Sequence, residues 1–208
     1  QRFCRIGSST YGEGKPKWGR YLLSNPKVLA ELTLSFFGGW RAYHTQQGDV
    51  PLRSRKTQAI LAYLAIEAGR EHSREALLGL FWPDMPEREA RNNLRVAISR
   101  LKRDLETNTG LRHPILTSTR HTIQFNNNDF VLTDVQQLEQ LLEQATSPTL
   151  SDAQNHQVAL VKAAKLYQGP LLEGFYLSDC WAFEEWLTVR REGFQRQMMV
   201  LFDKLVQN

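Results

Sequence analysis

The segment 87–105 carries the side chains with the most specific chemistry. At 100° per residue its apolar side chains share one helical face, and amide, hydroxyl and guanidinium side chains cover the opposite face. The apolar face comprises Ala90, Leu94, Ile98, Leu101 and Leu105. The opposite face comprises Asn92, Asn93, Val96, Ser99, Arg100 and Arg103, with Arg91, Arg95 and Lys102 on its flank.

The polar face of this helix has the chemistry of a nucleic-acid contact. A solvated amphipathic helix is the alternative, and such a helix usually mixes Glu with Lys on its outer face. Here guanidinium groups match the major-groove edge of guanine, and carboxamides match that of adenine. We therefore expect the helix to enter the major groove of double-stranded DNA.

Short strands flank the helices that must position this face. Strands are expected at 32–36, 40–45, 50–52, 115–117 and 122–125. The first three form an antiparallel meander, and the last two form a β-hairpin around the polar tip 118–121. The hairpin follows the third helix, where a winged helix carries its wing.

Two helices precede the polar one. The apolar spacing predicts a helix that ends at Gly69, and Ser73 is a suitable N-cap for the next. Pro83 and Pro86 then break the chain, because each disfavours helix in the residue before it. The order of elements predicts an α+β winged helix-turn-helix.

Charge and composition divide the chain. Residues 1–125 contain 20 Lys and Arg against 11 Asp and Glu, a net charge of +9, and the remainder contains 6 against 11, a net charge of −5. A basic half suits a polyanionic partner. We expect an uncharacterised extension at 1–30, a winged-helix domain at 31–127 and an all-α domain at 128–208. Helices in the last part are expected at about 134–145, 152–168 and 180–206.

The chain resembles a known family over most of its length. Residues 32–125 resemble the OmpR/PhoB-type winged-helix domain, in the variant of the SARP-type activators of bacterial gene clusters. The stretches that carry this resemblance are RKTQAILAYL at 55–64, SREAL at 73–77, FWP at 81–83 and, most specific, ARNNLRVAISRLK at 90–102. Residues 129–208 resemble the start of the bacterial transcriptional activator domain, an array of TPR-like helical hairpins. The marks of that domain are Asp134 after a short strand, LYQGPLL at 166–172 and FEEWL at 183–187.

The resemblance implies a role for each polar residue. Arg95, Val96 and Arg100 match the positions of the related recognition helix that face bases. Positions that contact or approach phosphates are matched by Asn92, Ser99, Lys102 and Arg103. In the wing, Gln124 stands where response regulators carry an Arg for the minor groove, so Arg120 at the tip is the candidate for a phosphate or groove contact.

These observations predict a sequence-specific, DNA-binding transcriptional activator in the cytoplasm. The resemblance implies promoter repeats as the target, a homodimer on DNA, and a helical domain for oligomerisation or contact with RNA polymerase. The alternative function is a TPR-like protein-interaction module or signalling scaffold that binds nucleic acid only non-specifically.

Other classes of protein have little support in the sequence. No Gly-rich phosphate loop occurs, and the five histidines show neither helical pairing nor Cys neighbours, so no nucleotide, metal or other cofactor is expected. Cys180 beside Trp181 indicates a packed core residue, and Glu184 and Glu185 point about 100° apart, so no enzyme is expected. The longest apolar run, 59–66, is far shorter than the ~20 residues of a membrane span. An RNA-binding module would expose aromatic side chains, which here fall at core positions.

An apolar seam along the last helix leaves three interpretations open. Its members are Phe183, Trp186, Val189, Phe194, Met198, Leu201, Phe202 and Leu205. Packing against the two preceding helices is one interpretation, and a partner protein is another. Because the related activator domain is normally longer, we expect a truncated helical array in which this seam awaits a further helix.

Overall fold

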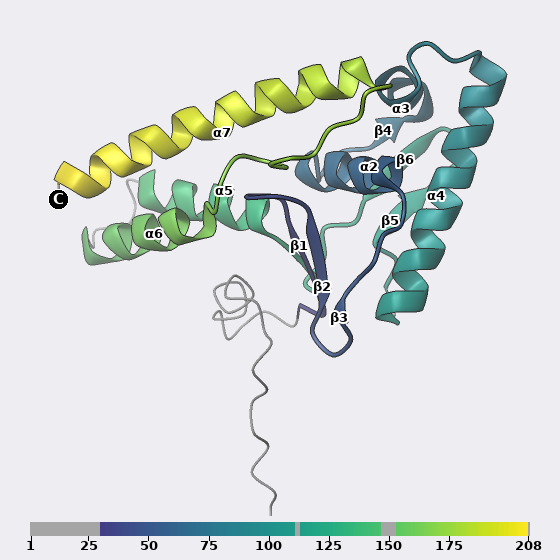
Figure 1. Ribbon diagram of the computed structural model, residues 1–208. Helices are drawn as coiled ribbons and strands as arrows, with labels where there is room; N and C mark the ends of the chain where they lie inside the picture. The colour runs from purple at the N-terminus through teal and green to yellow at the C-terminus, as the bar shows by residue number, and fades with distance from the viewer. Residues whose placement is uncertain (1–29, 111–112, 147–152, 208) are drawn as a thin grey trace, which may run out of the picture.

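The computed structural model describes residues 30–110, 113–146 and 153–207. The elements follow the predicted order of a β-meander, three helices, a β-hairpin and a helical region (Figure 1). The predicted fold class, a winged helix-turn-helix followed by helices, is confirmed. Almost all of the expected extension at 1–30, with Cys4, lies outside the described residues.

The first sheet has four strands in the order β3-β2-β1-β7. The strands β1 (Leu32–Ser35), β2 (Arg41–His44) and β3 (Gly48–Asp49) pair in antiparallel fashion, as the meander predicts. The fourth strand, β7 (Val131–Thr133), lies parallel to β1. Every residue of β1 is buried, because this strand is central in the sheet.

The strand predicted at 50–52 is wrong in position. The ladder of β3 ends at Asp49, although Val50 still donates a hydrogen bond from its N–H to the carbonyl of Ala42 at 2.9 Å. Pro51 has no N–H to donate and interrupts the pairing. Val50 and Leu52 are buried in the core without being part of a strand.

Three helices form the centre of the winged helix. They are α2 (Arg55–Ile66), α3 (Arg74–Phe81) and α4 (Glu87–Thr109). The Ser54 and Ser73 hydroxyls cap α2 and α3 by accepting backbone N–H groups at 3.4 and 3.1 Å. The third helix extends beyond its predicted end at residue 105 as far as Gly110, whose left-handed φ of 61° ends it.

The second sheet joins the wing to the start of α3. Its order is β4-β6-β5, with β5 (Leu116–Ser118) and β6 (Thr122–Phe125) as the predicted hairpin. The strand β4 (His72–Ser73) is not predicted by the sequence, and its His72 lies opposite Ile123. The chain therefore enters α3 directly from a strand of the wing sheet.

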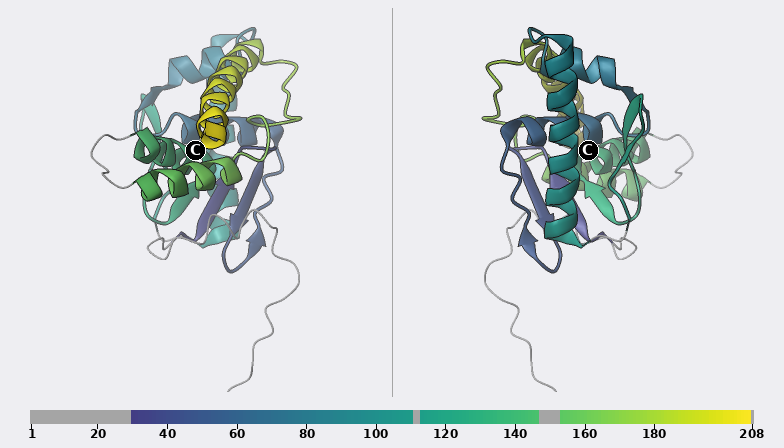
Figure 2. Two further views of the ribbon diagram at one scale, coloured as in Figure 1. Left: turned by 90° about the vertical axis from the view of Figure 1, so that its left-hand side faces the viewer. Right: turned by 90° about the vertical axis from the view of Figure 1, so that its right-hand side faces the viewer.

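The helical region comprises α5 (Asp134–Thr146), α6 (Ala153–Leu166) and α7 (Trp181–Gln207). Figures 1 and 2 show α5 and α6 side by side, with α7 running from above this pair to α3. The predicted seam on α7 is buried at Phe183, Phe194, Met198 and Leu201, so packing explains it there. Val189 and Phe202 remain exposed.

Aromatic side chains connect α7 to the winged helix. The ring of Phe183 lies 5.3 Å from that of Phe81, and the ring of Trp186 lies 4.9 Å from that of Tyr63. Residues on both sides of the predicted boundary at 127 belong to one cluster of buried apolar side chains. The division into domains at 127 stays a prediction.

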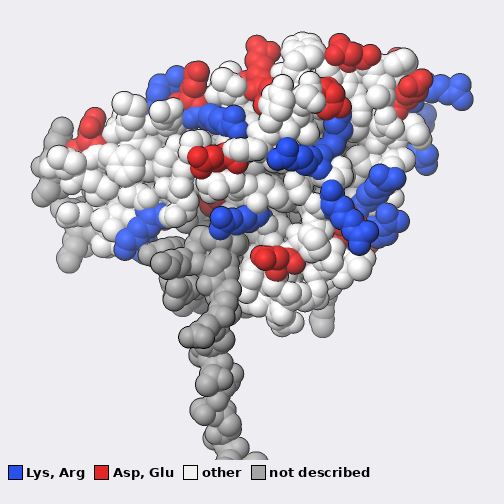
Figure 3. All heavy atoms as spheres, in the orientation of Figure 1, with Lys and Arg blue, Asp and Glu red and all other residues white. Residues whose placement is uncertain are grey.

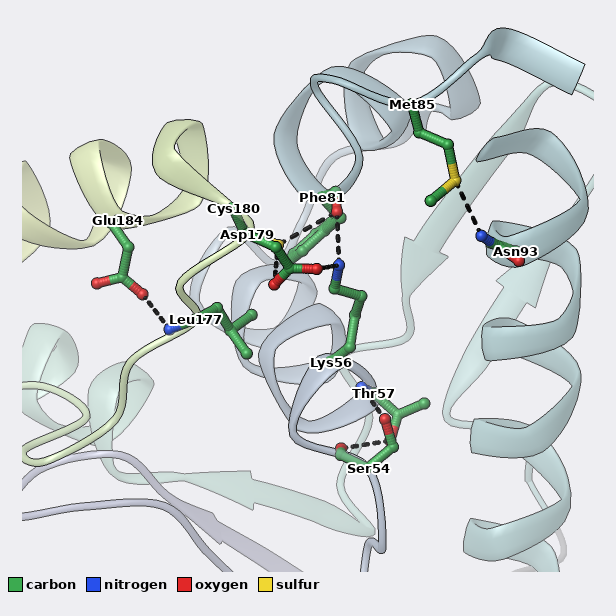
Figure 4. Close-up of polar contacts among 10 residues, drawn as sticks. All are labelled: Ser54, Lys56, Thr57, Phe81, Met85, Asn93, Leu177, Asp179, Cys180 and Glu184. Carbon is green, nitrogen blue, oxygen red and sulfur yellow. Dashed lines mark hydrogen bonds and ion pairs between the residues drawn. The ribbon is translucent and has the colours of Figure 1, made fainter. Parts of the chain in front are cut away.

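Polar contacts hold the segment before α7 against α2 and α3 (Figure 4). The ammonium of Lys56 on α2 donates to Asp179 Oδ2 at 2.6 Å and to the Phe81 carbonyl at 3.0 Å. The same carbonyl accepts the thiol of Cys180 at 3.2 Å, and Glu184 accepts the N–H of Leu177 at 2.7 Å. Cys180 is fully buried, which confirms its prediction as a core residue.

A buried carboxylate at the end of α2 makes a second connection to α7. Glu67 accepts the indole N–H of Trp186 at 3.0 Å and the Nε–H of Arg190 at 2.7 Å, and Arg70 donates to it at 2.5 Å. Burial acts to raise the pKa of Glu67, but these hydrogen bonds and the two guanidinium charges outweigh burial and lower it. The carboxylate is therefore ionised in the core contact between α2 and α7.

A second buried acid, Asp134, joins α5 to the end of β1. Its Oδ2 accepts the backbone N–H groups of Phe36 at 2.7 Å and Phe37 at 2.9 Å, whereas Oδ1 has no partner among the described residues. Burial raises the pKa of Asp134 to about 7, although the two N–H donors act to lower it.

Candidate nucleic-acid interface

The inner face of α4 is the predicted apolar stripe. The exposed fractions of its residues lie between 0 and 4%: Ala90 2%, Leu94 1%, Ile98 4%, Leu101 0% and Leu105 3%. This stripe packs on α2 and α3, so the direction of the opposite face is determined by the core. The apolar face read from the helical periodicity of the sequence is correct along the whole segment.

The outer face of α4 presents most of the predicted polar side chains to solvent. Five of them are exposed, namely Asn92, Arg95, Ser99, Arg100 and Arg103. Val96 and Lys102 are half-buried, and so is Asn93, which donates to the Met85 sulfur at 3.0 Å (Figure 4). Asn93 therefore points toward the α3–α4 connection and leaves the predicted contact face.

The position of α4 leaves this face uncovered by the described part of the chain. Figure 1 shows α4 at one edge of the molecule and α5, α6 and most of α7 at the opposite edge, and in the right-hand view of Figure 2 no other helix lies in front of α4. Figure 3 shows Lys and Arg side chains gathered over the beginning of α2, beside α4. Arg53 and Arg55, at this end of α2, are both exposed.

The first turns of α4 contain charged side chains that pair with one another. Arg91 donates to Glu87 at 2.6 Å and lies 3.2 Å from Glu75 on α3. The hydrogen bond to Glu87 and the charge of that carboxylate raise the pKa of Arg91. Because two carboxylates neutralise Arg91, the basic character of the face belongs to later turns.

The next polar pair on α4 lies within the predicted site. Arg95 donates to the Asn92 carboxamide oxygen at 2.9 Å, and both side chains are exposed. Arg100 and Arg103 follow one and two turns later on the outer face. The structure thus places seven of the eight predicted residues on one surface of one helix.

The eighth predicted residue, Arg120, lies at the tip of the wing. Its side chain is exposed between Thr119 and His121, and the N–H of Thr119 donates to the Thr122 carbonyl at 2.9 Å, which closes a tight turn. Gln124 is half-buried within β6. The wing therefore presents Arg120 and not Gln124.

Besides Arg53 and Arg55, two further basic residues near the interface are absent from the prediction. Arg88 is exposed in the first turn of α4, and Arg74 at the start of α3 binds the wing tip. The location of Arg88 follows from the helical period alone. That of Arg74 does not, because its partners lie 44 and 45 residues away along the chain.

Clusters of metal-ligating side chains and long apolar helices are both absent from the described residues. Within residues 30–110, 113–146 and 153–207, no group of three or more His, Cys, Asp or Glu side chains could hold a metal ion. No helix in these ranges is long and apolar enough to span a membrane.

Comparison with known proteins agrees with this geometry. Residues 48–122 match the model of the family described as transcriptional regulatory protein, C terminal. No curated protein matches the chain. Mycobacterium tuberculosis EmbR, solved in complex with a low-affinity phosphopeptide, is similar in structure, with a TM-score of 0.67 and 18% sequence identity. The similarity covers 84% of this chain and 44% of the EmbR chain, so this chain spans less than half the length of that protein.

The fold and the family match describe overlapping parts of the chain. At such low identity the EmbR structure shows a common fold, whereas the matched family model covers α2, α3, α4 and most of the wing. The chain therefore has a winged-helix fold, of which residues 48–122 match the model of transcriptional regulatory proteins, followed by a helical region.

Proposed function

We propose that this chain binds promoter DNA sequence-specifically and activates transcription from it. The observation that carries the proposal is the outer face of α4, where exposed guanidinium and carboxamide groups lie opposite a fully buried stripe. A helix surface that only faces water has no need of this combination of side chains, whereas a surface that contacts base edges and phosphates does. The protein would act wherever the cell keeps its DNA, which in a bacterium is the cytoplasm.

The residues of this face divide by chemistry. Arg95, Val96 and Arg100 contact base edges, with the two guanidinium groups directed at guanine and the Val96 side chain at an apolar group such as the thymine methyl. Phosphates are contacted by Asn92, Ser99, Lys102 and Arg103, and Arg120 adds a contact from the wing. Phosphate contacts determine the register of α4 in the groove, and base contacts select the sequence.

A single copy of α4 reads few base pairs, so the functional unit is a homodimer on DNA. Two copies on repeated half-sites about one or more helical turns apart would supply the specificity that one helix lacks. The helical region supplies the contact between copies or with RNA polymerase. Exposed Val189, Met199 and Phe202 on α7 favour a protein contact of this kind.

The same exposed side chains support a second candidate function. A protein-interaction module with only non-specific nucleic-acid binding would use the exposed side of α7 and would need no sequence preference in α4. The two functions differ in a single measurable property, the ratio of specific to non-specific affinity.

Selection from random DNA, followed by mobility-shift titration of the full chain, distinguishes them. We expect an enriched motif whose affinity falls steeply with salt, because bound phosphates release counterions. Arg100→Ala should cost about 1–3 kcal/mol and relax the preference at one base pair, whereas Arg196→Ala on α7 should change neither. Absence of any enriched motif would favour the interaction module.

Activation is tested by substitution, because the helical region cannot be removed cleanly. Deleting 128–208 would remove β7 from the first sheet and Phe183 from the core. A reporter assay with Met199→Ser and Val189→Ser in the full chain keeps the fold. We expect reduced activation at unchanged DNA affinity, and an unchanged reporter signal would exclude this surface of α7 from activation.

A further inference from the structure

The guanidinium of Arg74 connects the wing tip to the first residue of α3. Its Nε donates to the Thr119 carbonyl at 3.1 Å, and one terminal nitrogen donates to the same carbonyl at 3.0 Å and to the Ser118 hydroxyl at 2.8 Å. A planar guanidinium that directs two N–H groups at one acceptor restricts the position of that acceptor more than a single donor can. Arg74 is half-buried, and its bond to the Ser118 hydroxyl is partly buried, whereas its two bonds to the Thr119 carbonyl are exposed to solvent.

The backbone supplies an independent attachment at the same place. The N–H of Arg74 donates to the His121 carbonyl at 2.9 Å, and Ser73 pairs with Thr122 in the ladder of β4 and β6. The backbone therefore attaches the base of the turn to α3, and the guanidinium attaches its far side. Arg120 lies between these two attachments with its side chain exposed.

The start of α3 is also linked to α4. Glu75, the next residue, lies 3.2 Å from Arg91, and α3 packs along α4. A continuous series of contacts thus leads from the wing tip through Arg74 and α3 to Arg91, on the flank of the outer face of α4. The distance between Arg120 and the α4 side chains depends on that series.

We infer that Arg74 is a positioning residue for DNA binding, which holds Arg120 of the wing at a fixed place relative to α4. The inference rests on the proposed DNA-binding function and assigns Arg74 no contact with DNA of its own. Its guanidinium acts through the Thr119 carbonyl, so that the wing is ordered before DNA arrives. Ordering in advance reduces the entropy lost when Arg120 meets the duplex.

The first arm of the test uses the full chain without DNA. Amide hydrogen exchange is followed at Thr119, Thr122 and along α4 in the native protein, in Arg74→Ala and in Arg196→Ala as a matched control. We expect faster exchange at Thr119 in Arg74→Ala alone, with the α4 amides unchanged. Exchange at Thr119 that does not change would overturn the inference whether or not the protein binds DNA.

The second arm measures affinity for the selected DNA over a range of salt concentrations. Arg120→Ala should weaken binding about fivefold or more and reduce the salt slope by about 1. Arg74→Ala should reproduce that loss, and the double variant should lose no more than Arg120→Ala alone. A further fall in the salt slope in the double variant would show that Arg74 binds phosphate directly. An Arg120→Ala variant with native affinity would show that the wing has no role in binding. Either result overturns the inference.

Arg74→Lys separates geometry from charge. Lysine keeps the positive charge but cannot direct two N–H groups at the Thr119 carbonyl. We expect Arg74→Lys to behave like Arg74→Ala in both arms. Full rescue by lysine would contradict a role for the paired N–H groups of the guanidinium. If the native protein binds no DNA but Arg74→Ala still speeds exchange at Thr119, the proposed function is refuted, while the ordering of the wing tip by Arg74 stands.

Discussion

Two buried carboxylates illustrate how surroundings decide the behaviour of one chemical group. Asp134 has two backbone donors and no cation beside it, and burial raises its pKa to about 7. Glu67 is also buried but faces two guanidinium groups and an indole N–H, which lower its pKa. Opposite pH dependences of stability follow from these opposite shifts.

At Asp134 the raised pKa predicts a loss of stability as pH rises. The folded protein holds this proton up to about pH 7, whereas an unfolded Asp releases it near pH 4, so the contribution is fully present below pH 4 and is lost as pH rises toward 7. Asp134→Asn cannot ionise. Between pH 4 and 7 we expect the free energy of unfolding of the variant to rise, relative to that of the native protein, by up to about 1.4 kcal/mol per pH unit. Urea unfolding at several pH values measures this, and a difference independent of pH would contradict it.

At Glu67 the lowered pKa predicts stability that is present above the unfolded value of about 4.5 and lost as pH falls through the folded value. Glu67→Gln keeps the shape but loses the charge that Trp186 and Arg190 meet. We expect a cost of about 1–3 kcal/mol at pH 7, measured by urea unfolding. Glu192→Gln, in an exposed pair 3.7 Å from Arg196, is the control and should change stability by less than about 0.5 kcal/mol.

At the scale of elements, α4 separates stability from function between neighbouring residues. Leu101 is fully buried and Arg103 is exposed. Leu101→Ala should cost about 2–5 kcal/mol of unfolding free energy through lost burial and a cavity. Arg103→Ala should change stability by less than about 0.5 kcal/mol but weaken binding to all DNA sequences about equally. Thermal unfolding and mobility shifts of both variants test this, and equal effects on both properties would contradict the assigned faces.

The elements that could be predicted from sequence are those held together by local patterns. The stripe of α4 from Ala90 to Leu105 repeats over about four turns, and Ser73 marks the start of α3 with its own chemistry. The candidate site follows from the same periodicity, except at Asn93, where the nearby Met85 sulfur draws the side chain inward.

The elements that were missed depend on partners far along the chain. Strand β4 has two residues and exists because β6 lies beside it, about 50 residues later. The partnership of β7 with β1 joins residues about 100 positions apart. The sequence contains no pattern for β4, and for the short strand expected before Asp134 it indicates no partner. The role of Arg74 depends on the distant pairing of β4 with β6.

At the scale of the whole molecule, the core crosses the predicted boundary. Phe183 on α7 is fully buried against Phe81, and β7 completes the sheet of β1. We expect one cooperative unfolding transition, with indole fluorescence and helical circular dichroism changing together. Phe183→Ala should lower the free energy of unfolding by about 3–5 kcal/mol and shift the midpoint of both signals together. Two separate transitions would instead support independent domains divided at 127.

The parallel pairing of β1 with β7 has a consequence for biosynthesis. Leu32 leaves the ribosome about 100 residues before the strand that lies beside it. Until then the nascent polypeptide carries an unpaired edge of buried-type residues, which is prone to association with other chains. Cellular chaperones therefore have a defined interval in which to bind it, and ribosome arrest shortly after the wing should lengthen that interval.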